Sequence, residues 1–161
     1  MSGRHYSNQP HGFTLIEILI VVVILGILAG IVIPQFNNAT TTSKTGSVQT
    51  TAQTLRGAVQ LYYCQHSDTL PPAASFWTLM MSQTDSKGVA YNSASSVDGP
   101  FGPYVQSIPS NALNLSTTVI DAATGPGGQT TSSCGWVYDY NSGTGTGTVH
   151  GTGSDQKTVL P

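Results

Sequence analysis

The amino-acid sequence predicts an α+β protein in which a long N-terminal helix packs on a small antiparallel β-sheet. Three observations lead to this fold class. An uncharged apolar run extends from Ile18 to Ile33. A stretch with helical periodicity, 37–66, follows it. Three short segments rich in β-branched and aromatic residues lie in the C-terminal third.

The first element is the apolar segment Phe13 to Ile33, whose 21 residues would form a helix about 30 Å long. This length matches the hydrocarbon thickness of a bilayer, so we expect a membrane span. Arg4, His5 and His11 precede it, which places the N-terminus in the cytoplasm and the remainder outside. A cleaved secretory signal is the weaker interpretation, because Glu17 interrupts the apolar stretch and Ile27 occupies position −3 of the best cleavage site.

The second element is an amphipathic continuation of this helix. Gly46 and Gly57 weaken its intrinsic propensity, so packing must hold it. We expect Pro34 to be able to kink the helix without ending it, and Pro71-Pro72 to end it. The apolar residues that recur at steps of three and four are Val48, Ala52, Leu55, Val59, Tyr62 and Tyr63.

The C-terminal region supplies the remaining elements. Phe76 to Met81 is apolar enough for a short buried helix, and 84–103 reads as a loop. A turn at Asn141-Ser142-Gly143 predicts an antiparallel hairpin between the last two of three strands. The predicted strands are Leu115 to Ala122, Gly135 to Tyr140 and Thr146 to His150.

The composition argues against nucleic-acid binding. Of the 161 residues only 7% are charged, and five Lys and Arg against seven Asp and Glu leave a formal net charge of −2. Such a chain builds no basic patch for phosphate backbones, so nucleic-acid binding by electrostatics is disfavoured. Abundant neutral polar residues favour an exported surface.

The most informative single residue is Glu17, a carboxylate inside an otherwise apolar segment. An ionisable group there costs about 2.5–3.5 kcal/mol on insertion scales, so it calls for a partner. It lies four residues after the Gly12-Phe13 junction, where a new amino terminus would supply a cation. The alternative is a Glu that reaches the membrane interface without a partner.

The stretch Gly12 to Pro34 resembles the N-terminus of bacterial type IV pilins and type II secretion pseudopilins. The resemblance rests on Gly12, on Phe13-Thr14-Leu15-Ile16-Glu17, and on Gly26 and Pro34, where the family commonly has helix breakers. It implies a pilin-like fold with a leader at 1–12, a transmembrane assembly helix at 13–33, its amphipathic continuation at 34–67 and a periplasmic globular domain at 68–161.

The resemblance also implies a processing and assembly chemistry. A prepilin peptidase would cut between Gly12 and Phe13, the new Phe13 amine would be N-methylated, and Glu17 would pair with the Phe13 amine of a neighbouring subunit. A free α-amino group is cationic at neutral pH, with an ordinary pKa of about 7.7–8.0, so the pair would reduce two desolvation costs. The spacing of Gly26, Ala29 and Gly30 permits close helix contact, although Gly is also common in spans.

The function implied is that of a structural filament subunit, not an enzyme, and no cofactor motif is present. Its partners would be further copies of the chain, a prepilin peptidase, an inner-membrane assembly platform, minor pilins or pseudopilins, and the membrane itself. It would cross the inner membrane once and then enter a periplasmic or extracellular filament. Gly102 to Pro109 and Gly135 to Tyr138 resemble major pseudopilins, which favours type II secretion. A type IV pilus subunit and a membrane-anchored or secreted binding domain are the alternatives.

Two departures from the family pattern matter. His11 replaces the basic residue usual before the Gly. Asp139 and Asp155 lack the clustering of the calcium loop that major pseudopilins often carry, so we predict no metal.

The two cysteines, Cys64 and Cys134, are expected to form one disulfide in an oxidising compartment, with free thiols as the alternative. Closing that loop would stabilise the fold by roughly 4 kcal/mol in the chain-entropy model. A zinc site formed by the two cysteines with His66 and His150 is a remote alternative, because the spacing lacks paired local ligands.

Overall fold

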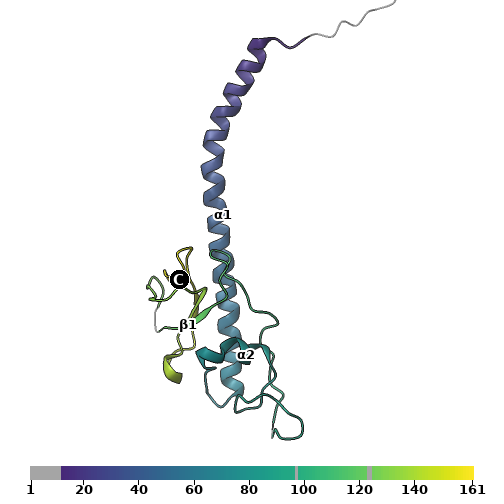
Figure 1. The fold of residues 1–161 in the computed structure, drawn as a ribbon, viewed down its shortest axis with the longest axis vertical. Helices are drawn as coiled ribbons and strands as arrows, with labels where there is room; N and C mark the ends of the chain where they lie inside the picture. Colours follow the sequence, from purple (N-terminus) through teal and green to yellow (C-terminus); the bar gives the residue numbers. More distant parts are fainter. Residues whose placement is uncertain (1–11, 97, 123–124) are drawn as a thin grey trace, which may run out of the picture. The chain divides into compact units, whose positions relative to one another are not determined.

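The structure is a computed structural model that describes residues 12–96, 98–122 and 125–161. The predicted leader therefore lies outside the described residues, except for Gly12. The elements in chain order are helix α1 (Leu15–Gln65), the 3₁₀ turn η1 (Ala73–Ser75), helix α2 (Phe76–Met81), strand β1 (Val119–Asp121), strand β2 (Trp136–Tyr138), the 3₁₀ turn η2 (Asn141–Gly143) and strand β3 (Val149–Gly151) (Figure 1).

The described residues divide into two compact units, one that ends at Thr40 and one that begins at Thr41. The first contains the N-terminal part of α1. This helix is long and apolar enough, by length and composition, to cross a membrane. It continues through both Gly26 and Pro34, so neither residue ends it in the single subunit. The expectation that Pro34 does not stop the helix is confirmed.

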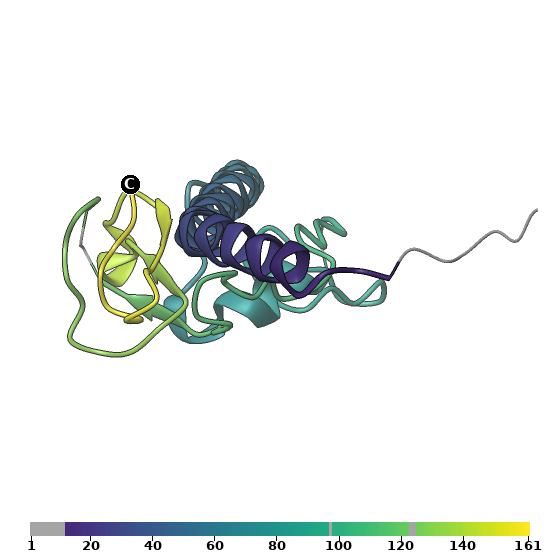
Figure 2. The same ribbon diagram turned by 90° about the horizontal axis from the view of Figure 1, so that it is seen from above.

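The second unit begins inside α1, at Thr41, so the C-terminal part of this helix belongs to the globular unit. The predicted apolar stripe is its buried face: Val48 and Val59 are at most 1% exposed, and only Tyr63 is half-buried. This face packs on residues from α2 and the sheet, which include Phe76, Met80, Trp136, Tyr138 and Val149. In both views the C-terminal strands, drawn green to yellow, lie on one side of α1 (Figure 2).

Helix α2 has the predicted bounds, and its buried side chains are Phe76 and Met80. The Met80 carbonyl accepts hydrogen bonds from the backbone N–H groups of Tyr104 (2.8 Å) and Val105 (3.0 Å). These bonds attach the loop that follows α2 to the end of that helix.

The sheet has the order β1-β2-β3. The predicted antiparallel hairpin is confirmed, with Val137 opposite His150. The prediction of a wholly antiparallel sheet is wrong, because β1 runs parallel to β2, with Ile120 opposite Val137. The connection 122–135 is long enough to return the chain to the same end of the sheet, which parallel pairing requires. On the way, Thr130 and Cys134 bond to the carbonyls of Lys157 and Gln156.

Candidate assembly site

The N-terminal end of α1 is closed by a reciprocal pair of residues, Thr14 and Glu17. The Thr14 backbone N–H and hydroxyl both donate to Glu17 Oε2, at 2.8 and 2.7 Å. The Glu17 N–H in turn donates to Thr14 Oγ1 at 3.3 Å. This is a capping box, which satisfies backbone donors that a helix start otherwise leaves unpaired.

This local role of Glu17 was not predicted, although the sequence contains its signal, Thr followed three residues later by Glu. The carboxylate was expected to need a partner, and in the single subunit that partner is Thr14. The pairing of Glu17 with the Phe13 amine of a neighbouring subunit involves a second chain and a cleaved terminus, so it stays a prediction.

The described side chains from Phe13 to Ile33 are all exposed. Leu15 is 85% exposed and Ile33 61%. A continuous apolar surface of this extent is rare on a soluble monomer and marks contact with lipid or with other protein. No charged residue lies between Glu17 and Lys44, so the part of the surface after Glu17 carries no charge.

The two glycines within this surface are not required by the packing of the subunit itself. A Cβ atom added to Gly26 or Gly30 would meet nothing within 4 Å in the described structure. Their small size therefore has no explanation inside the described chain, whereas it would allow a second helix to approach closely. The predicted role of Gly26 and Pro34 as helix breakers concerns an assembled filament and remains a prediction.

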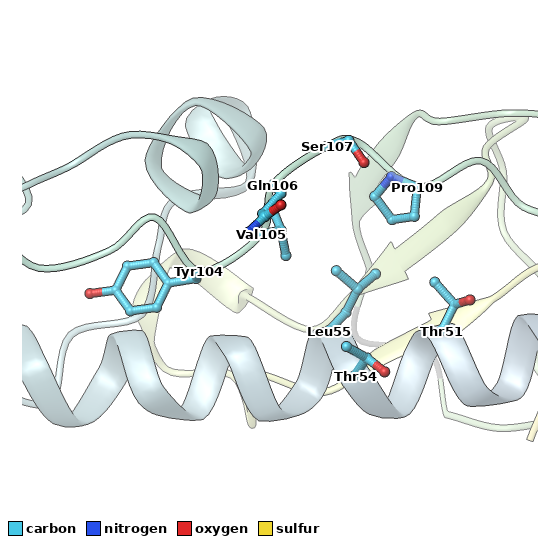
Figure 3. Close-up of a pocket in the computed structure, with 8 residues that line it drawn as sticks. All are labelled: Thr51, Thr54, Leu55, Tyr104, Val105, Gln106, Ser107 and Pro109. Carbon is cyan, nitrogen blue, oxygen red and sulfur yellow. The ribbon is translucent and has the colours of Figure 1, made fainter.

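The segment that resembles major pseudopilins packs beside α1 in the globular unit. The Tyr104 hydroxyl donates to Gln65 Oε1 at 2.7 Å. The segment faces the helix across a small hollow (Figure 3), and the volume of this hollow is about 290 Å³. Its lining comes from both sides and consists of Thr51, Thr54, Leu55, Tyr104, Val105, Gln106, Ser107 and Pro109.

The predicted disulfide is absent from the structure, where Cys64 and Cys134 are both free. Cys64 is exposed near the end of α1, whereas Cys134 is buried in a small cluster with Val137 and Val159. Burial raises the pKa of the Cys134 thiol. The oxidising compartment and the number of cysteines favour a disulfide, but neither determines where the two side chains lie in the fold.

The residues considered for zinc are held by separate partners. His66 is buried against Tyr62, with the ring centroids 3.7 Å apart, and bonds to the Tyr62 carbonyl and the Thr84 hydroxyl. His150 bonds to Arg56. Across the described ranges, no group of three His, Cys, Asp or Glu residues is placed to hold a metal ion.

Comparison with known proteins finds similarity in the segment that contains Thr14, Glu17 and the apolar start of α1. The profile of the family described as "Prokaryotic N-terminal methylation motif" matches residues 7–33. A fimbrial protein of Neisseria meningitidis serogroup A is 33% identical over 82 residues, which cover 51% of this chain and 47% of the relative. The type IV major fimbrial protein FimA of Dichelobacter nodosus is 47% identical over 54 residues, which cover 34% of this chain and 35% of the relative.

A relative from a different machine matches to a similar extent. The type II secretion system core protein G of Pseudomonas aeruginosa is 43% identical over 55 residues, covering 34% of this chain and 39% of the relative. The matches thus span less than half the length of each of these relatives. No solved structure matches.

Residues 7–33, which include the exposed apolar start of α1, therefore carry a prokaryotic N-terminal methylation motif. The N-terminal part of the chain is similar both to type IV fimbrial proteins and to a type II secretion core protein G.

Proposed function

We propose that this chain is a structural subunit of a type IV-pilus-like filament. The observation that carries the proposal is the exposed, uncharged surface of α1 from Ile18 to Ile33, which lies within the matched methylation motif. Removing such a surface from water is favourable by about 25 cal/mol per Å² of apolar area. The helix is therefore more stable in lipid or against other helices than in water. A filament core formed by these helices offers the second environment once the subunit leaves the membrane.

The proposed maturation supplies the partner that Glu17 needs in the filament. In the uncut chain the Phe13 nitrogen is a neutral amide. Cleavage after Gly12 by a prepilin peptidase creates an amine that is cationic at neutral pH, and N-methylation keeps it basic. A carboxylate and an amine that leave water together reduce each other's desolvation cost, and only subunits in the correct register bring them together.

The capping box indicates that Glu17 has one partner before assembly and another one after it. Before assembly, the Glu17 carboxylate is satisfied by Thr14 of its own chain. On assembly, the neighbouring Phe13 amine approaches a carboxylate that is already ordered at the helix start. We therefore infer that Thr14 orients Glu17 before the intersubunit contact forms.

Among the machines that use such filaments, we propose a type II secretion pseudopilin. The support is the packing of Tyr104 and Val105 against α1 and α2 in a segment that resembles major pseudopilins, together with the similarity to a core protein G. A type IV pilus subunit is the second candidate, which the fimbrial relatives favour. Both roles share the proposed inner-membrane insertion, the assembly platform and the minor subunits.

Mass spectrometry tests the maturation. Co-expression of the full chain with an active prepilin peptidase should yield a protein that begins at Phe13 and carries one extra methyl group on its amine. A catalytically inactive peptidase is the control and should leave residues 1–12 attached. A mature start near Gly30 would contradict the proposal and indicate a signal peptide.

Complementation separates the two machines. The gene would be expressed in one host that lacks its major pseudopilin and in another that lacks its major pilin. Restored protein secretion in the first host supports the pseudopilin role, and restored surface pili in the second support the pilus role.

A further inference from the structure

Strand β3 has an outer edge that is covered by two groups from elsewhere in the globular unit. Arg56 Nε, from α1, donates to the Val149 carbonyl at 2.6 Å. The Leu160 N–H, from the C-terminal segment, donates to the Gly151 carbonyl at 2.8 Å. Covered in this way, the strand edge offers no free carbonyls at these two positions to another chain.

His150 lies between Val149 and Gly151 in β3 and contacts Arg56, one of the two covering groups. Its ring Nδ1 is 2.9 Å from Arg56 Nη2, and its side chain also forms a hydrogen bond with the backbone of Leu160. The residue is only 8% exposed. The Arg56 guanidinium is always a donor and never an acceptor. Nδ1 must therefore be the acceptor, which requires a neutral imidazole with its proton on Nε2.

We propose that His150 and Arg56 form a proton-sensitive latch on the outer edge of β3, closed while His150 is neutral and released when Nδ1 takes up a proton. Protonation would turn an acceptor into a donor that faces another donor at hydrogen-bond distance. It would also place two positive charges side by side in a half-buried site. Arg56 cannot lose its proton in response, so the contact has to separate.

The charges around His150 determine the pH range of the latch. The charged groups that face it are Arg56 from α1 and Asp139 from the segment after β2. Burial, and then Arg56, lower the pKa of His150 below its ordinary value, while the hydrogen bond with Leu160 and the Asp139 charge oppose this shift. The latch is therefore fully closed above the ordinary value of about 6.5 and opens as the pH falls below it.

The test follows the latch in the full chain in detergent micelles. At pH 7.5, nitrogen NMR of the His150 ring should show a proton on Nε2 and none on Nδ1. Between pH 7.5 and 5, amide exchange corrected for its intrinsic pH dependence should show a several-fold loss of protection at Leu160 and along β3. A protonated Nδ1 at pH 7.5 would overturn the proposal.

Two substitutions distinguish a latch from general acid sensitivity. His150→Asn places a non-titrating acceptor oxygen near the position of Nδ1. In this variant the amide protection of Leu160 and β3 should therefore not change between pH 7.5 and 5. In Arg56→Gln, the glutamine side chain can accept a hydrogen bond from a protonated ring as well as donate one to a neutral ring. This variant should therefore show no acid-induced loss of amide protection at Leu160 and along β3. His66→Asn removes the other buried histidine of the globular unit and should leave the loss at Leu160 in place. An unchanged loss in His150→Asn would refute the latch.

Discussion

Gly151 in β3 lies directly against Val48 in α1, so closely that a Cβ atom at position 151 would overlap the Val48 Cγ1 methyl group. Both residues are buried, and Val48 is 1% exposed. The helix and the sheet can approach this closely only because position 151 has no side chain. The contact sets the distance between the two layers of the globular unit.

The first prediction follows from this contact. Gly151→Ala should destabilise the globular unit by about 1–3 kcal/mol, because the added methyl group forces the helix and the strand apart. Thermal unfolding of the full chain in detergent micelles measures the change. An unchanged unfolding temperature would show that α1 and β3 are not packed in this way.

A matched substitution on the same helix should act in the opposite direction. Gly57 is exposed, and a Cβ atom there would meet nothing within 4 Å in the described structure. Gly57→Ala should therefore stabilise α1 by up to about 1 kcal/mol, through helix propensity alone. A loss of stability for this variant would indicate that the exposed side of α1 is covered.

Asn111 is predicted to be a second determinant of the fold. This fully buried side chain donates to the carbonyls of Gly135 (2.9 Å) and Thr152 (2.8 Å) and accepts from the Leu113 N–H (2.8 Å). Asn111→Ala leaves these groups unpaired and should cost about 1–3 kcal/mol or more, measured by thermal unfolding. Asn92→Ala, which loses an exposed turn contact to Ala94, is the control and should change stability little.

The residues at these contacts also explain which features could be predicted from the sequence. The buried face of α1 and the bounds of α2 follow from periodic local patterns, and both predictions are correct. The parallel pairing of β1 with β2, and the role of Asn111, depend on contacts between distant segments that leave no local pattern. The capping of α1 by Glu17 has a local signal, but the more conspicuous cost of a charge in a membrane segment obscured it.

The state of the cysteines gives a direct chemical prediction. In the folded full chain, purified without reductant, a maleimide should label Cys64 quickly and Cys134 only after denaturation, since Cys64 is exposed and burial raises the pKa of the Cys134 thiol. Intact-mass measurement should therefore find one label on the native protein and two on the denatured one. Denatured protein that takes up label only after reduction would establish the disulfide that the structure lacks.

The hydrogen bonds that Asp155 accepts in the C-terminal loop should be lost at low pH. Its carboxylate accepts from the Thr158 hydroxyl and from the N–H groups of Lys157 (3.0 Å) and Thr158 (2.9 Å), and these bonds lower its pKa to about 2. Because this pKa lies below the ordinary value, the loop contacts should be complete above about pH 4 and lost as the pH falls toward 2. Carboxyl NMR measures the titration directly. An Asp155 pKa at its ordinary value would contradict these contacts, and Asp155→Asn should remove the effect.

The two roles of Glu17 can be separated by its amide analogue. Glu17→Gln keeps a side chain that can complete a capping box but removes the charge. Under the proposed assembly mechanism, this variant should insert, be cleaved after Gly12 and retain protected amides at the start of α1, yet fail to polymerise. Electron microscopy of sheared filaments, with amide exchange on the detergent-solubilised subunit, measures both properties.

Thr14 provides the matched variants. Thr14→Ser keeps the hydroxyl and should preserve the helix start, whereas Thr14→Ala should weaken it by about 0.5–2 kcal/mol. Because neither change removes the Glu17 charge, fraying in Thr14→Ala alone would assign the helix start to the cap. Normal filaments from Glu17→Gln would show that assembly needs only the cap, and the proposed pairing of Glu17 with the Phe13 amine would then be rejected.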